Sequence, residues 1–228
     1  MRPLFRGPLQ VSPADALGLA GFGPVPLPGP WPAGLALSPH SREGDEGRTA
    51  VGDLLDRFKY GGERALARSL AQALAAALTG RGAVHRAPGA GVVNDAPTGH
   101  PDTSTFQQVE VIVHVPATTA RLRVPPTCDL ARALAREMRV RCLPHFLACT
   151  RKLAHQKDLS RFEDKRQNVR AAFQVRRADF ITGKKLLLLD DVYDSGATLE
   201  EVWRVLMQAG AGEVVVAALT QTRYRRDA

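Results

Sequence analysis

The sequence predicts an α/β protein built on a parallel β-sheet with helices packed against it. Residues 186–189 form an uninterrupted run of leucines, as expected for a strand that is buried on both faces of a parallel sheet. A helical pattern begins directly afterwards at Leu199, and a second apolar strand follows over 214–219. This strand–helix–strand order is the repeating unit of parallel sheets, and Gly210 is a plausible end for its helix.

The sequence predicts one ordered domain, and two irregular segments lie in or near its N-terminal half. Residues 1–33 are rich in Pro and Gly and predict an extended or partly disordered arm. A short strand is predicted over 34–40, and a long helix over 49–79 that can break at its double glycine. Residues 80–108 are rich in Gly, Pro, Asp, Ser and Thr and predict a mobile insert. The remaining chain, 34–228, is predicted to form the domain.

The C-terminal half continues the alternation of strands and helices. Apolar runs and periodicity predict a strand over 107–115, a helix over 127–138 with Thr127 as a candidate cap, and a short strand over 140–146. A flexible loop and helix are predicted over 147–170, followed by a strand over 171–175.

Composition limits the classes of function. The chain has 228 residues with 44% hydrophobic residues, which is enough for one sizeable core. Its net charge of +8 favours anionic partners, either small phosphorylated molecules or nucleic acid. Aromatic residues make up only 6% of the chain, which argues against a stacking platform for single strands.

No apolar run is long enough to predict a membrane-spanning helix, so no membrane partner is expected. Prolines in the first 13 residues interrupt any signal-peptide core, and we expect a cytoplasmic protein with reduced thiols. The three cysteines, Cys128, Cys142 and Cys149, show no Cys-x-x-Cys spacing, so no structural zinc is predicted.

Two adjacent carboxylates, Asp190 and Asp191, end the leucine strand. Ligands of open parallel sheets bind beyond the carboxyl ends of the strands. Neighbouring residues on a strand point to opposite faces, so at most one of the pair points directly into a given crevice. Carboxylates accept hydrogen bonds from hydroxyls and bind Mg²⁺, directly or through water, so this pair is a candidate for both.

A polar turn follows the acidic pair and leads directly into the helix. Unpaired backbone N–H groups and the helix dipole attract a phosphate at such a position. Glycine allows close approach of the ligand, and the hydroxyls add donors. The candidate phosphate-binding residues are Asp194, Ser195, Gly196, Ala197 and Thr198.

The segment from Leu187 to Thr198 resembles the signature with which type I phosphoribosyltransferases bind phosphoribosyl pyrophosphate (PRPP). Other segments resemble the ComF-like phosphoribosyltransferases, which are linked to bacterial competence and DNA uptake. These are the Lys-Tyr-x-Gly segment at Lys59, the strand over 111–116 that ends in Pro, and the basic stretch from Arg151 that leads to Asn168-Val169 and Ala172-Phe173. The resemblance covers about residue 34 to the C-terminus, without the four-cysteine zinc module of many members.

This resemblance implies a type I phosphoribosyltransferase-like sheet with a flexible loop and a small N-terminal hood. It implies an enzyme that moves a phosphoribosyl group from PRPP, with Mg²⁺, to a nitrogen acceptor that the sequence does not identify. Asp190 and Asp191 would be the catalytic pair at the ribose hydroxyls, and residues 194–198 would bind the 5′-phosphate. Pyrophosphate would bind at Thr118, Thr119 and Arg121, and a lid would be formed by Arg151, Lys152 and Lys157.

An alternative is a non-catalytic competence or DNA-processing protein that uses the same fold as a nucleotide- or DNA-binding scaffold. Residues 117–126 lack the glycine and asparagine that follow the Val-Pro strand in the ComF-like family. This departure affects the expected pyrophosphate loop and favours the scaffold over the enzyme at that position.

Overall fold

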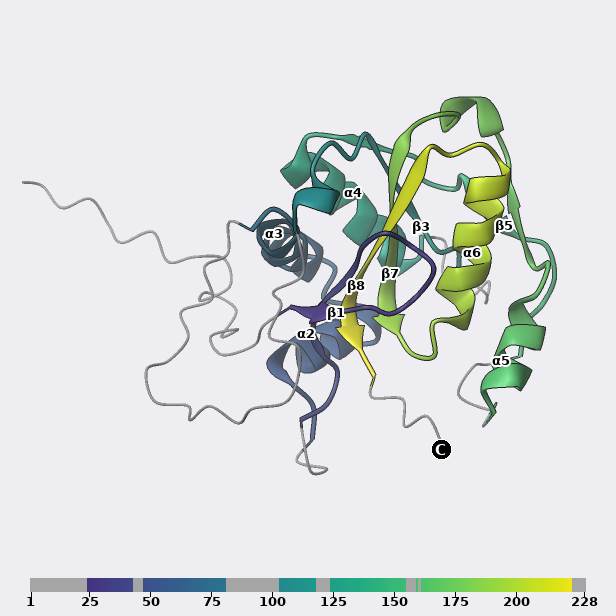
Figure 1. Ribbon diagram of the computed structural model, residues 1–228. Helices are drawn as coiled ribbons and strands as arrows, with labels where there is room; N and C mark the ends of the chain where they lie inside the picture. Colours follow the sequence, from purple (N-terminus) through teal and green to yellow (C-terminus); the bar gives the residue numbers. More distant parts are fainter. Residues whose placement is uncertain are drawn as a thin grey trace, which may run out of the picture.

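In the computed structural model, a six-stranded sheet with the order β1-β2-β8-β7-β3-β4 forms the centre of the molecule (Figure 1). The structure describes residues 24–42, 47–80, 103–117, 124–154, 159 and 161–222. Neighbouring strands are parallel from β2 to β4, and only β1 is antiparallel. The strands are β1 (Val25–Pro26), β2 (Gly34–Pro39), β3 (Val111–His114), β4 (Arg141–Cys142), β7 (Lys185–Tyr193) and β8 (Glu213–Gln221).

Helices cover both faces of the sheet. On one face lie α2 (Ala50–Lys59), α3 (Leu66–Leu78) and α4 (Pro126–Met138), and on the other lies α6 (Ala197–Gln208) (Figure 1). Leu187 and Leu189 pack in the core beneath α2, α3 and α4, whereas Leu186 and Leu188 pack in the core beneath α6. The predicted α/β fold with a parallel sheet between helices is therefore confirmed.

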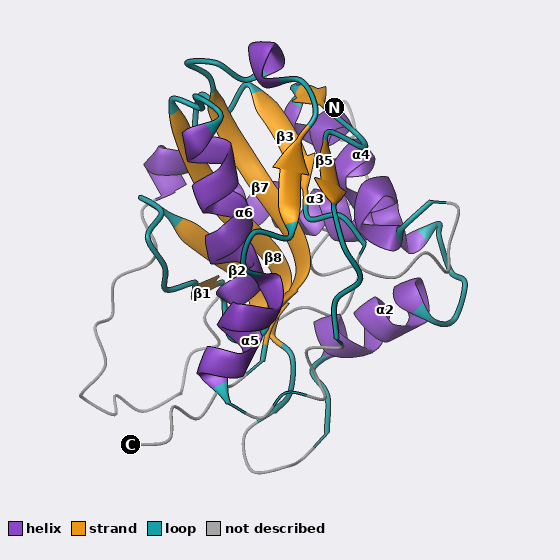
Figure 2. Ribbon diagram, turned by 90° about the vertical axis from the view of Figure 1, so that its right-hand side faces the viewer, coloured by secondary structure: helices purple, strands orange, loops and turns teal. Residues whose placement is uncertain are grey.

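A smaller unit lies beside α6. It consists of the antiparallel pair β5 (Leu147–Cys149) and β6 (Phe173–Val175), with α5 (Phe162–Val169) between them in sequence. Figure 2 shows α5 close to the end of α6 at which that helix begins. Two 3₁₀ turns, η2 (Thr103–Phe106) and η4 (Ala178–Phe180), complete the described secondary structure.

Several element boundaries differ from the sequence predictions. The predicted helix over 49–79 is two helices, α2 and α3, separated by a turn in which Gly62 has φ +73°. β7 continues to Tyr193, beyond the leucine run, because it keeps pairing with β8 as far as Gln221. Thr127 is not the cap of α4: the helix starts after Pro125 with Pro126 in its first turn, where the missing N–H of proline is tolerated.

Part of the predicted N-terminal arm packs on the domain. β1 pairs with β2, and Trp31 is buried with its indole N–H donating to the carbonyl of Leu27 at 2.9 Å. At the end of the predicted insert, Phe106 of η2 is buried. Residues 1–23 and 81–102 lie outside the described residues, so the proposed domain boundaries stay predictions.

Across the described ranges, no helix combines the length and apolar character needed to cross a bilayer.

Candidate functional site

Polar side chains gather where neighbouring parallel strands end. His114 ends β3, Asp190 and Asp191 lie near the end of β7, and Thr222 follows β8. Because parallel strands end at one edge of the sheet, residues far apart in the sequence meet there. The two carboxylates predicted as the catalytic pair are therefore at the edge where this fold class binds ligands.

Asp191 is paired with a lysine from α2. Its Oδ2 atom lies 2.8 Å from Lys59 Nζ, and it accepts a longer hydrogen bond from the Thr127 hydroxyl at 3.4 Å. Burial opposes the charge on Lys59, but the attraction of Asp191 and their hydrogen bond outweigh it, so the pKa of Lys59 is raised. In the sequence, a lysine at a helix end is usually solvated, and only the Lys-Tyr-x-Gly resemblance marks this one.

The pKa of the Asp190 carboxyl is raised, which favours its protonated form. Burial raises the pKa of its carboxyl, and repulsion from Asp191 raises it further. Two interactions oppose this shift: the Asp191 N–H donates to Asp190 Oδ1 at 2.8 Å, and the positive charge of Lys59 lies nearby. A cation bound beside the pair would favour ionisation of Asp190. Two carboxylates are a normal protein contribution to a Mg²⁺ site, in which waters and substrate oxygens supply the other ligands. The residues present therefore fit Mg²⁺.

The turn between β7 and α6 has the geometry of an anion site. Gly196 precedes the first residue of α6 with φ +84°, and its carbonyl accepts the first helical hydrogen bond, from Glu200 N–H at 2.9 Å. Among the described residues, no acceptor takes the amide hydrogens of Ser195, Gly196 or Ala197. The turn thus presents unpaired N–H donors at the positive end of a helix dipole.

A hydrogen bond and an aromatic contact hold the side chain of Tyr193 in place just before this turn. Tyr193 is buried, its hydroxyl donates to the carbonyl of Pro28 at 2.8 Å, and its ring packs edge-on against Trp31 with centroids 6.4 Å apart. A Cβ atom at Gly196 would lie 2.5 Å from the Tyr193 hydroxyl. Only glycine therefore fits this position without displacing the tyrosine.

Asp194 is engaged by two partners. Its Oδ2 lies 2.6 Å from Lys165 Nζ, and its Oδ1 accepts from the Thr222 hydroxyl at 2.8 Å. The side chain of Lys165 is only 8% exposed. Lys165 was not among the predicted site residues, because it lies within a basic stretch. Its spacing of four from the buried Val169 is the helical signal that could have marked it.

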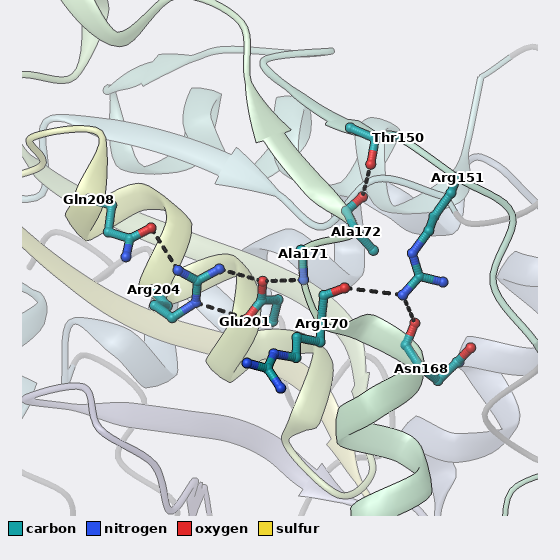
Figure 3. Close-up of polar contacts among 9 residues, drawn as sticks. All are labelled: Thr150, Arg151, Asn168, Arg170, Ala171, Ala172, Glu201, Arg204 and Gln208. Atoms are coloured by element: carbon teal, nitrogen blue, oxygen red, sulfur yellow. Dashed lines mark hydrogen bonds and ion pairs between the residues drawn. The ribbon is translucent and has the colours of Figure 1, made fainter.

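The structure describes two of the predicted lid residues, Arg151 and Lys152. Arg151 contacts the end of α5, and Lys152 lies on the surface. Arg151 donates to the carbonyls of Asn168 at 2.8 Å and Arg170 at 3.1 Å, as Figure 3 shows. The guanidinium group of Arg151 thus supplies hydrogen-bond donors to carbonyls at the C-terminus of α5. Lys152 is exposed. The predicted contact of both residues with pyrophosphate stays a prediction.

The other predicted residues, Lys157 of the lid and Thr118, Thr119 and Arg121 of the pyrophosphate loop, lie outside the described residues.

His114 is a packed residue at this edge. Its Nδ1–H donates to the carbonyl of Val115 at 2.9 Å, while Nε2 is buried without a partner. Burial lowers the pKa of His114, and the nearby His145 and Arg132 lower it further, whereas the hydrogen bond to Val115 opposes the shift. The imidazole is therefore neutral at pH 7.

Comparison with known proteins agrees with this geometry. Residues 129–227, from the first turn of α4 to beyond β8, match the phosphoribosyl transferase domain family. The matched segment contains the acidic pair and the turn of residues 194–198. The sheet between two layers of helices is the arrangement expected of a type I phosphoribosyltransferase fold.

No curated protein matches the chain. Among solved structures, one described as the "structure of the allosteric regulatory enzyme of purine biosynthesis" is similar, with 21% identity and a TM-score of 0.33. The similarity covers 48% of this chain and 22% of that one.

Proposed function

We propose that this protein binds PRPP with Mg²⁺ and transfers the phosphoribosyl group to a nitrogen acceptor. The observation that carries the proposal is the set of unpaired amides from Ser195 to Ala197, which lies four residues beyond the acidic pair on β7. The match of residues 129–227 to a phosphoribosyl transferase domain supports it.

Each group in the site has a role in this chemistry. The amides at the start of α6 bind the 5′-phosphate and fix the position of the ribose. Asp190 and Asp191 accept hydrogen bonds from the ribose hydroxyls, and their negative charge stabilises the oxocarbenium character that develops at the anomeric carbon. The bond from that carbon to pyrophosphate breaks, a bond to the acceptor nitrogen forms, and the nitrogen releases a proton. Mg²⁺, when bound, neutralises charge on the departing pyrophosphate.

The test is calorimetric titration of PRPP with and without Mg²⁺, combined with an assay for pyrophosphate release with a panel of nitrogen bases. We expect Asp190→Asn/Asp191→Asn to lose Mg²⁺-dependent PRPP binding, because the carboxylates proposed to serve the ribose and the cation are gone. Asp179→Asn is the matched control, since Asp179 is exposed on η4 and pairs only with nearby Arg177 among the described residues. Unchanged PRPP affinity in the double variant would refute the assignment.

The second candidate, a nucleic-acid-binding scaffold, is supported by a basic hollow at the sheet edge. An open hollow of about 450 Å³ lies between α4 and the segment around β4. Its lining contains three arginines and no acidic residue: Arg132, Ala135, Arg136, Arg139, Val140, Cys142 and Pro144. Guanidinium groups suit the phosphate oxygens of a nucleic acid backbone.

A gel shift with DNA at increasing salt separates the two functions. A shift that weakens steeply with salt, without pyrophosphate release, would support the scaffold. Replacing Arg132, Arg136 and Arg139 together by Gln should then flatten the salt dependence, whereas Arg177→Gln, which removes an arginine paired with Asp179, should not.

A further inference from the structure

Asp194 poses an electrostatic problem in the proposed phosphate turn. It is adjacent in sequence to the first of the unpaired amides, so an unbalanced carboxylate here would repel the phosphate that those amides bind. Most of the effect of the helix N-terminus would be lost to this repulsion, because a full charge exceeds the partial charge of a helix end.

Lys165 supplies the balancing charge. Among the described residues it is the only buried lysine or arginine, and its Nζ is 2.6 Å from Asp194 Oδ2. The second oxygen of Asp194 accepts from Thr222, so the carboxylate is held on both sides. A lysine is rarely buried unless it is paired, and this pairing places its charge at the phosphate turn.

We propose that Lys165 is a positioning residue that neutralises Asp194 and thereby makes the turn receptive to a sugar phosphate dianion. This inference rests on the proposed function, since it concerns the same phosphate site. Lys165 acts through Asp194, and the amides of the turn bind the ligand.

The attachment of α5 to α6 does not depend on Lys165 alone. Glu201 accepts from the Ala171 N–H at 2.8 Å directly after α5, as Figure 3 shows. Arg166 lies 3.9 Å from Glu200. These contacts keep α5 in place when Lys165 is replaced by an uncharged side chain of similar length, so the charge can be changed with the scaffold retained.

The experiment measures binding of ribose 5-phosphate without Mg²⁺ to the full chain and to Lys165→Met, Asp194→Asn and the double variant. We expect Lys165→Met to bind about 30-fold more weakly, the size of one unpaired charge near the ligand at the protein surface. Asp194→Asn should bind several-fold more tightly, because the carboxylate that repels the phosphate is then gone. The double variant should return to within about threefold of the wild-type affinity.

A purely structural role for the pair predicts a different pattern, and that pattern overturns the proposal. In that case both single variants bind more weakly and the double variant shows no recovery. Lys184→Met is the matched control, because Lys184 pairs with Glu110 at the opposite end of β7. Thermal unfolding of each variant checks that it is folded. If Lys165→Met fails to fold, Asp194→Asn still decides, since weaker binding by that variant refutes the charge argument.

Failure of the proposed function looks different from failure of this inference. If wild-type protein binds neither PRPP nor ribose 5-phosphate, both are wrong. If it binds them but the double variant does not recover, only the role of Lys165 is refuted.

Discussion

Gly196→Ala tests the geometry of the phosphate turn most directly. An L-residue at φ +84° carries a strain of about 1–2 kcal/mol. The new methyl group would lie 2.5 Å from the Tyr193 hydroxyl and 3.0 Å from Cζ of the ring. Tyr193 is buried against Trp31 and cannot move away without breaking its hydrogen bond to Pro28, which is worth about 1 kcal/mol.

We therefore expect Gly196→Ala to lower the free energy of unfolding by about 2–3 kcal/mol. It should also weaken PRPP binding at least tenfold, because a displaced turn changes the direction of its unpaired amides. Urea denaturation measures the first effect, as a lower midpoint with an unchanged slope, and calorimetry measures the second.

Gly183→Ala is the matched control for this variant. Gly183 has a similar φ of +70°, but a Cβ atom there would meet nothing within 4 Å. It should show the strain alone and leave PRPP binding unchanged. The reasoning is refuted if Gly196→Ala is no less stable than Gly183→Ala and binds PRPP as the wild type does.

Two further predictions concern the acidic pair. The pKa of Asp190 is raised in the folded state, so the unfolded chain loses this proton at a lower pH than the folded protein does. The stability of the ligand-free protein therefore falls as pH rises above the unfolded pKa of about 3.9. Asp190→Asn should therefore unfold at a higher temperature than the wild type at neutral pH, with the gap closing towards pH 4. A gap that is independent of pH in thermal unfolding would contradict this. Lys59→Met should lower the free energy of unfolding by about 1–3 kcal/mol, because it leaves the largely buried Asp191 carboxylate without its cation. The double variant with Asp191→Asn should recover part of that loss in urea denaturation, and no recovery would show that the two side chains are not coupled.

Some of the site could be predicted because its signals are local. The leucine run, the adjacent acids and the glycine before the helix lie within 13 consecutive residues, and each has a direct structural consequence. The strand, the turn and α6 follow one another in the predicted order, although β7 extends to Tyr193 and α6 begins at Ala197. Thr127 shows the limit of this reasoning: its hydroxyl had the right chemistry for a helix cap, but the preceding prolines start the helix earlier and leave it facing Asp191.

The electrostatic partners of the site could not be predicted in the same way. Lys59 and Lys165 come from α2 and α5, more than 100 residues apart in the chain, and each reaches one carboxylate near the end of β7. In the sequence both lie among many other basic residues, most of which are solvated. Which of these lysines loses its water and pairs with an acid depends on how the helices pack against the sheet.

The order of residues from 186 to 198 alone thus predicts a strand, an acidic edge and a candidate anion-binding turn, because hydrogen bonding and side-chain alternation act between near neighbours. The balance of charge at that edge is set by the folded chain. Ion pairs between distant segments depend on burial and distance, and both exist only after α2 and α5 have docked on the sheet.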